Sequence, residues 1–144
     1  MKHCTVNHPH HYTHHASGVE AITITENLGF NLGNAFKYLF RCGVKGDPTE
    51  DLRKALWYLE RERERREFLH FRFESDRYDA RFDGEHAIAK ILRVEHRYSG
   101  HMTSALERIY AAGHHSRWIK CLNQAIERVR TMIRIQEHRS ANSL

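Results

Sequence analysis

The chain has 144 residues, of which 40% are hydrophobic and 28% are charged, and its formal net charge is +5 at pH 7. This length allows one domain with a hydrophobic core of its own. No apolar run approaches the roughly 18 to 20 residues of a membrane-spanning helix, and the N-terminal residues lack the hydrophobic segment of a signal peptide. The three cysteines show no C-x-x-C spacing. We therefore expect a cytoplasmic protein without a membrane partner.

The first 17 residues are polar and rich in histidine and lack an amphipathic period, so we expect an extended N-terminal arm. From Gly18 onward the apolar spacing is helical and predicts an all-α fold, a compact bundle of about five or six helices. The expected helices cover about 18–28, 31–41 with Asn31 as N-cap, 47–67 and beyond with Asp47 as N-cap and Pro48 in the first turn, 85–97, 102–112 and 117–137. Gly43 is expected to end the second of them.

We expect a single domain over 1–144, made of the arm (1–17), a first helical unit (18–67), a connector (68–84) and a second helical unit (85–144). The connector alternates aromatic and charged residues, which fits a loop, a helix end or a short strand. Acidic and basic residues alternate in ERERERRE at 60–67, which is typical of a solvated helix face. Because the basic residues form no stripe, we do not expect nucleic acid as a partner. Trp57, Trp118 and the phenylalanines are predicted to lie in the core.

The second unit repeats the apolar pattern of the first at a distance of 70 residues. Four pairs are identical and five more are both apolar: Ala35/Ala105, Gly43/Gly113, Leu52/Leu122 and Ala55/Ala125, then Leu32/Met102, Phe36/Leu106, Leu39/Ile109, Leu56/Ile126 and Leu59/Val129. This pattern suggests two helix–turn–helix units packed about a pseudo-twofold axis. The polar residues are not repeated, since Lys37, Tyr38 and Arg41 correspond to Glu107, Arg108 and Ala111. We therefore expect the chemistry in the first unit.

Polar side chains gather on one face of the predicted hairpin between 31 and 67. Asn34, Lys37, Tyr38 and Arg41 are spaced i, i+3, i+4 and i+7, which places them on one side of a helix. Lys45 follows in the turn, and Asp51, Lys54 and Tyr58 share a face of the next helix. Arginine offers a planar fork for phosphate and lysine a compact charge. The alternative is a solvated surface with i,i+4 pairs.

The hairpin turn reads GVKGD and lacks the Walker A pattern, so helix side chains would have to hold any phosphate. The histidines of the arm (His3, His8, His10, His11, His14 and His15) invite a zinc hypothesis, but no paired cysteines or H-E-x-x-H motif support one. We expect no metal site there. Instead, one or two of these histidines are predicted to fold over the basic groove, where their titration would make binding depend on pH.

Four segments together resemble a family of small tailed-phage proteins known as nucleotide kinases, which look like deoxynucleoside-monophosphate kinases without a P-loop. The segments are NHPHHY, GVEAITITE, GNAFKYLFRCGVKG and EDLRKALWYLERE, all between residues 7 and 62. The resemblance implies phosphoryl transfer between deoxynucleotides in the cytosol of an infected bacterium, with Mg²⁺ as the implied cofactor. It does not extend to the residues after Glu67.

The resemblance also implies roles for individual residues. The expected catalytic residues are Lys37, Arg41, Glu20 and Asp51, in which the cations hold phosphates and a carboxylate positions the metal or the acceptor. The expected nucleotide-binding and phosphate-binding residues are His11, Tyr12, Asn34, Tyr38, Lys45, Lys54 and Tyr58. No residue is assigned as a protein ligand of a metal. We expect a homo-oligomer, because a groove between subunits would complete a site that one helical hairpin leaves shallow.

Two other functions remain open from the sequence. One is a MazG-like, all-helical nucleoside-triphosphate pyrophosphohydrolase, which binds magnesium through E-x-x-E and E-x-x-D pairs that the predicted groove does not show. The other is a protein that binds a nucleotide without catalysis, or that binds a host protein. Release of pyrophosphate would identify the first, and recovery of unchanged ligand would identify the second.

Overall fold

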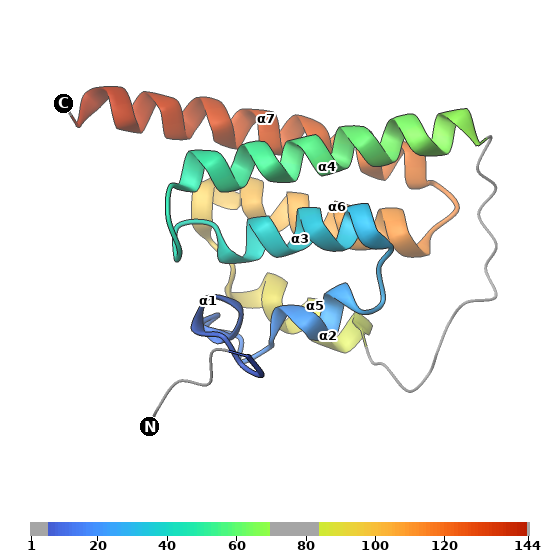
Figure 1. The fold of residues 1–144 in the computed structure, drawn as a ribbon, viewed down its shortest axis with the longest axis horizontal. Coiled ribbons are helices and arrows are strands. Elements are labelled where there is room, and N and C mark those ends of the chain that lie inside the picture. The colour runs from blue at the N-terminus through green and yellow to red at the C-terminus, as the bar shows by residue number, and fades with distance from the viewer. Residues whose placement is uncertain (1–5, 70–83, 144) are drawn as a thin grey trace.

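The computed structural model describes residues 6–69 and 84–143, and these residues form an all-α fold, as predicted (Figure 1). The His3 of the predicted arm and most of the predicted connector (70–83) lie outside the described residues. The helices are α1 (His10–Thr13), α2 (Ala21–Thr25), α3 (Phe30–Arg41), α4 (Pro48–Phe68), α5 (Gly84–Val94), α6 (His101–His114) and α7 (Trp118–Asn142), with a 3₁₀ turn η1 (Arg97–Gly100) before α6.

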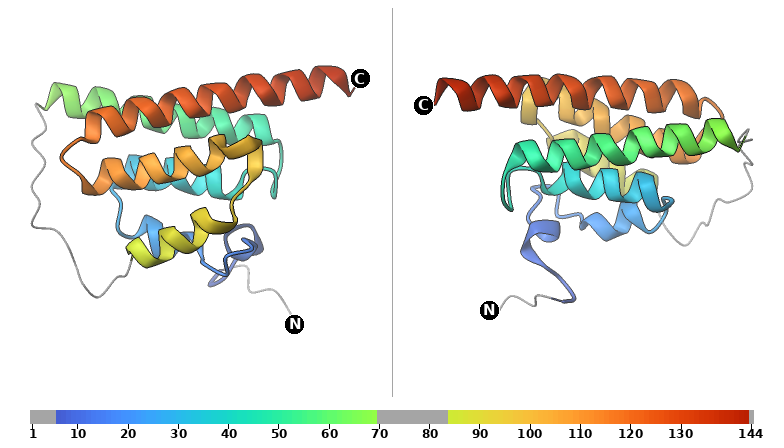
Figure 2. Two further views of the ribbon diagram at one scale, coloured as in Figure 1. Left: turned by 180° about the vertical axis from the view of Figure 1, so that it is seen from behind. Right: turned by 45° about the horizontal axis from the view of Figure 1, so that its top comes forward.

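The helices α2 to α7 stack as three layers of two. In each layer one helix comes from each half of the chain: α4 lies along α7, α3 lies along α6, and α2 lies beside α5 (Figures 1 and 2). The hairpins α3–α4 and α6–α7 are the two predicted helix–turn–helix units. None of the described helices is both long enough and apolar enough to span a bilayer.

The two hairpins bury the same positions, 70 residues apart. Leu32, Ala35, Phe36 and Leu39 of α3 are fully buried, and so are their counterparts Met102, Ala105, Leu106 and Ile109 of α6. The same holds for Leu52, Ala55 and Leu59 of α4 against Leu122, Ala125 and Val129 of α7. The residues that begin α4 and α7, Pro48 and Trp118, are also 70 positions apart. The apolar repeat in the sequence is therefore a repeat of buried positions in the fold.

The first hairpin is bounded by the expected signals, with one correction. The Asp47 side chain accepts a hydrogen bond of 2.9 Å from the backbone N–H of Thr49, so it caps α4, and Pro48 follows in the first turn. Gly43 turns the chain with φ +82°, whereas its counterpart Gly113 lies within helix α6. The predicted cap at Asn31 is wrong. The Gly29 carbonyl already accepts from the N–H of Gly33, so α3 begins earlier, at Phe30.

The predicted extended arm is wrong for the part of it that the structure describes. Residues His10–Thr13 form the short helix α1, which contacts α2 and α3. The next turn carries His15, whose side chain is only 7% exposed and stacks on Phe40 with ring centroids 4.9 Å apart. The segment is therefore packed against the bundle, close to the end of α3.

Candidate functional site

The aromatic ring of Tyr38 lies among three cations on the outer side of the α3–α4 hairpin. Lys37 Nζ is 4.7 Å from the ring centroid, Arg41 Cζ is 5.1 Å from it, and Lys54 Nζ is 5.4 Å from it. Tyr58 of α4 stacks on the same ring, with 6.0 Å between centroids. The negative ring face attracts cations, although three positive charges at one ring also repel one another. We call these five residues the Tyr38 surface.

Arg41 is held in place by a buried carboxylate on the neighbouring helix. Its Nε and Nη2 donate to Asp51 Oδ1, at 3.2 and 3.0 Å, and the Asp51 side chain is only 2% exposed. Burial would lower the pKa of Arg41, but its hydrogen bonds to Asp51 and Tyr12 outweigh burial and raise it. The guanidinium is therefore charged at every ordinary pH, and Tyr12 is placed against it.

Asp51 was predicted to position a metal or an acceptor, and the structure gives it another role. Its Oδ1 accepts both bonds from Arg41, and its Oδ2 is buried without a hydrogen-bond partner among the described residues. Burial raises the pKa of Asp51, and the opposing effect of Arg41 is smaller. A carboxylate enclosed in this way fixes the position of Arg41 and offers no exposed oxygen to a ligand.

The two lysines of the Tyr38 surface have different partners. Lys54 pairs with Glu50 at 2.7 Å, one turn earlier on α4. Lys37 donates to the amide oxygen of Asn34 at 2.9 Å, which is a neutral partner. Asn34 in turn donates to the carbonyl of Phe30, so its oxygen is turned toward the lysine. Within residues 6–69 and 84–143, no carboxylate neutralises the charge of Lys37, and an anionic ligand would supply that neutralisation.

His11 lies in the field of the same basic group. Burial lowers its pKa, and the nearby charges of Lys45 and Arg41 lower it further. Its ring also packs against Tyr12, with 4.0 Å between centroids. The expectation that a histidine of the arm folds over the basic groove agrees with this arrangement, in which α1 brings both residues to the end of α3.

Glu20 is not brought together with the other predicted catalytic residues. Its carboxylate pairs with Nδ1 of His8 at 2.8 Å, at the start of α2. The structure therefore groups ten of the eleven predicted site residues by direct contact or by charge, and leaves Glu20 in a separate pair. The grouped residues are His11, Tyr12, Asn34, Lys37, Tyr38, Arg41, Lys45, Asp51, Lys54 and Tyr58.

Two exposed aromatic residues adjoin the Tyr38 surface, and the sequence analysis missed both. Phe30 is 76% exposed and Trp57 is 59% exposed, so the prediction that they belong to the core is wrong, as it is for Phe68 at 82%. Both rings contact Tyr58, at 6.0 and 5.0 Å between centroids. At about 100° per residue, Trp57 points away from the apolar face of α4, and this signal could have placed it correctly.

The end of α3 is fixed by a buried charge cluster from the second half of the chain. Glu95 accepts from Arg97 Nε and Nη2 at 2.9 and 2.7 Å and from His15 Nε2 at 3.0 Å. Because His15 Nδ1 accepts from the backbone N–H of Ser17, the ring proton lies on Nε2. Burial alone would raise the pKa of Glu95, but the bonds from Arg97 and His15 hold it well below its usual range. Arg97 also donates to the carbonyl of Cys42.

These contacts join three segments that the sequence analysis treated separately. The α1 segment, the end of α3 and the start of η1 meet at Glu95, which is 9% exposed. The second half thereby holds the N-terminal segment against the basic residues of the first. Within the described residues, no group of three or more His, Cys, Asp and Glu side chains is placed to hold a metal ion.

The comparisons with known proteins bear on the first half alone. Residues 6–60 match a family described as a protein of unknown function, DUF3310. The matched residues include α1 to α3 and most of α4, and so contain the Tyr38 surface, Phe30 and Trp57. Neither a curated protein nor a solved structure matches the chain. The segment from 6 to 60 is therefore similar to the DUF3310 family, and the Tyr38 surface lies within that similarity.

Proposed function

We propose that the Tyr38 surface binds a deoxynucleotide, and that the protein handles deoxynucleotides as the phage kinase-like proteins it resembles do. The observation that carries this proposal is the grouping of three cations at the Tyr38 ring beside exposed aromatic rings. Phosphate oxygens are the natural acceptors for such a group, and an exposed aromatic ring provides a stacking face for a base.

In the proposed binding mode, the phosphate of a monophosphate contacts the lysines and its base contacts an exposed aromatic ring. Its phosphate would lie near Lys37 and Lys54, where Lys37 donates to the neutral amide of Asn34. Its base would stack on Trp57 or Phe30, which flank Tyr58. Arg41 would contribute its charge from a fixed position, because Asp51 restrains its guanidinium.

Phosphoryl transfer would require this site to place a donor and an acceptor in line and to neutralise the transferred charge. Mg²⁺ supplies part of that neutralisation and is commonly held by one or two carboxylates together with the phosphates themselves. Glu50 is the exposed carboxylate beside the Tyr38 surface, and it is paired with Lys54. One carboxylate fits that mode of binding, in which the nucleotide provides most of the ligands.

A non-catalytic role is the second candidate, and one observation favours it. Two of the residues predicted to be catalytic, Arg41 and Asp51, form an ion pair with each other, and Asp51 is buried. In that role the site holds a nucleotide, and neither Arg41 nor Asp51 is free to orient an acceptor.

Calorimetry with a panel of deoxynucleoside monophosphates tests the binding proposal. We expect binding by the wild type and a roughly tenfold or greater loss of affinity in Lys37→Ala/Lys54→Ala, because two charge-assisted contacts to phosphate are removed. Lys90→Ala, at an exposed lysine of α5, is the matched control and should bind as the wild type does. Equal affinities for the wild type and the double variant would refute the site.

The chemistry is decided by analysing the ligands after incubation with a nucleoside triphosphate and Mg²⁺. A diphosphate product from the monophosphate identifies a kinase, pyrophosphate identifies a pyrophosphohydrolase, and unchanged ligand identifies a binding protein. Light scattering of the same samples measures the oligomeric state. If Phe30 and Trp57 form a subunit interface instead of a stacking face, Phe30→Ala/Trp57→Ala will dissociate the oligomer and leave nucleotide affinity unchanged.

A further inference from the structure

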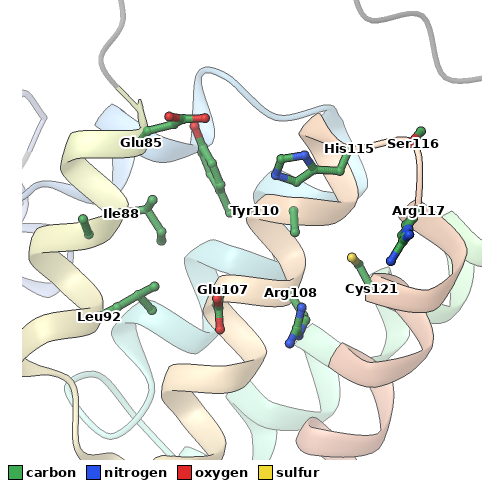
Figure 3. Close-up of a pocket in the computed structure, with 12 residues that line it drawn as sticks. Glu85, Ile88, Leu92, Glu107, Arg108, Tyr110, His115, Ser116, Arg117 and Cys121 are labelled. Atoms are coloured by element: carbon green, nitrogen blue, oxygen red, sulfur yellow. The ribbon is translucent and has the colours of Figure 1, made fainter.

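A pocket of about 550 Å³ opens between α5, α6 and the start of α7. It lies on the side of the molecule where α5, α6 and α7 face the viewer, with α3 and α4 behind them (Figure 2, left). Figure 3 shows side chains from all three helices directed toward this space. The volume lies within the range of about 300 to 1,000 Å³ that is typical of small-molecule sites.

The pocket overlaps in part the place in the second hairpin that corresponds to the Tyr38 surface, because three of the five equivalent positions line it. Six residues of its lining stand 70 positions after polar residues of the first hairpin: Glu107 after Lys37, Arg108 after Tyr38, Ala111 after Arg41, His115 after Lys45, Arg117 after Asp47 and Cys121 after Asp51. Because the two hairpins bury the same positions of the 70-residue repeat, residues 70 positions apart lie on the same side of their hairpins. The fold thus offers the same location twice, with different side chains.

The different side chains explain why the second location is hollow. In the first hairpin, the ion pair between Arg41 and Asp51 fills the space between the helices. In the second, the much smaller Ala111 and Cys121 stand at those positions and line the pocket. At the positions of the guanidinium and the carboxylate, the second hairpin thus has two small side chains that border the pocket.

The end of the pocket at the α6–α7 turn is suited to an anion. His115 and Arg117 line it, and Arg108 lines the pocket farther back along α6 (Figure 3). Arg117 is also the N-cap residue of α7, and no side chain caps that helix, whereas the Asp47 carboxylate caps α4. Free N–H groups and the helix dipole at an N-terminus favour an anion. An acidic group of a ligand would take the place that the Asp47 carboxylate has in the first hairpin.

The opposite wall is suited to an uncharged body. Ile88 and Leu92 of α5 supply its apolar surface, and Glu85 and Glu107 can accept hydrogen bonds from a ligand. Arg108, Arg117 and Glu107 make no ion pair with any residue in the described ranges. Cys121 is only 7% exposed and also lines the pocket. Its thiol forms no disulfide with another described residue.

We propose that this pocket is a second ligand site, which binds a small organic anion with its acidic group at the start of α7 and its body against α5. The acidic group can be a phosphate or a carboxylate, since both are planar or tetrahedral oxygen acceptors that suit arginine and free backbone N–H groups. The site is separate from the Tyr38 surface and does not depend on the function proposed for it.

Nuclear magnetic resonance of the full chain tests the proposal, in the Lys37→Ala/Lys54→Ala background so that binding at the Tyr38 surface does not interfere. The probes are thymidine 5′-monophosphate for the phosphates and indole-3-acetate for the carboxylates. Thymidine, which lacks the acidic group, and inorganic phosphate, which lacks the organic part, are the controls. We expect one of the two organic anions to shift the backbone amides of residues 117–121. Thymidine and inorganic phosphate should shift them at least tenfold more weakly at equal concentration.

Two variants separate a ligand site from a passive hollow. Arg117→Glu reverses an exposed charge and should weaken binding of the organic anion at least tenfold, whereas Lys90→Glu on α5 makes the same change away from the lining and should not. Ala111→Arg/Cys121→Asp introduces the ion pair of the first hairpin and should close the pocket to the probes. Alkylation of Cys121, followed by peptide mass spectrometry, provides a readout that does not depend on the shifts, and bound anion should slow it.

The proposal is overturned if neither organic anion shifts residues 117–121, or if thymidine binds there as tightly as its monophosphate. It is also overturned if Arg117→Glu and Lys90→Glu bind alike. None of these outcomes bears on the function proposed for the Tyr38 surface, because that function is tested by substituting Lys37 and Lys54 in the otherwise native chain.

Discussion

The hairpins α3–α4 and α6–α7 share a buried framework and differ where they face solvent. Seven buried positions of the first correspond to seven buried positions of the second. At the polar positions, an ion pair and three cations on one hairpin correspond to an open pocket with mixed charges on the other. Burial therefore constrains the apolar residues of both hairpins in the same way, while the polar positions of the first hairpin carry different side chains in the second.

The largest expected effects test the shared framework. Leu39→Ala and Ile109→Ala each remove a fully buried side chain at equivalent positions, and each should lower the free energy of unfolding by about 3 kcal/mol. Urea denaturation measures both values. Because the positions are equivalent, the two losses should agree within about 1 kcal/mol, and a much larger difference would show that the hairpins are not packed alike.

A smaller effect is expected from exchanging the polar residues of the hairpins. Arg41→Ala leaves the buried Asp51 carboxylate without its hydrogen-bond donor and should cost about 2 kcal/mol of stability. Arg41→Ala/Asp51→Cys reproduces the pair found in the second hairpin and should recover part of that loss, because no buried charge remains. Denaturation of the two variants tests this. The comparison fails if the double variant is less stable than Arg41→Ala.

The pH dependence of stability should reflect the first half of the chain. Burial lowers the pKa of His14 below its usual 6.5, and the nearby charge of Arg97 lowers it further. Above pH 6.5 the ring is neutral in both the folded and the unfolded chain. As the pH falls below 6.5 the unfolded chain takes up the proton more readily, so the free energy of unfolding decreases until the lower folded pKa is reached.

Denaturation curves between pH 7.5 and 5.5 measure this slope, and His14→Gln should reduce it. Part of the slope should remain in that variant, because burial and the charges of Lys45 and Arg41 also lower the pKa of His11. An unchanged slope in His14→Gln/His11→Gln would contradict the assignment.

The smallest effect on stability is expected at the exposed aromatic residues. Trp57 is 59% exposed and lies outside the core, so Trp57→Ala should change the free energy of unfolding by less than about 0.5 kcal/mol. If a base stacks on this ring, the same variant should lose roughly threefold to tenfold in nucleotide affinity. Phe68→Ala, at a similarly exposed ring near the end of α4, is the matched control and should retain full affinity.

Periodicity was sufficient to predict most of the fold. The apolar spacing of Leu32, Phe36 and Leu39 fixes the buried face of α3, and the same spacing marks α4, α6 and α7. The Asp47–Pro48 start of α4 follows from local capping, which is a property of a few adjacent residues. The cationic face of the hairpin was predicted for the same reason, since positions three and four apart lie on one side of a helix.

Contacts between distant segments were not predictable in this way. The bond from His15 to Glu95 joins residues 80 positions apart, and neither residue carries a local signal for it. The ordered α1 segment depends on this contact, so the arm was predicted to be extended. The pocket was not predicted for a related reason, because small residues such as Ala111 and Cys121 give no positive signal, and their effect appears only in the folded chain.

The most direct test of the central claim is a titration of the isotopically labelled wild-type chain with a deoxynucleoside monophosphate, followed by nuclear magnetic resonance. The account predicts that the backbone amides of α3 and α4 around Lys37, Arg41 and Lys54 shift with a single affinity, and that Lys37→Ala/Lys54→Ala abolishes those shifts. Shifts that leave α3 and α4 unaffected, or that persist unchanged in the double variant, would contradict the claim that the Tyr38 surface is the nucleotide site.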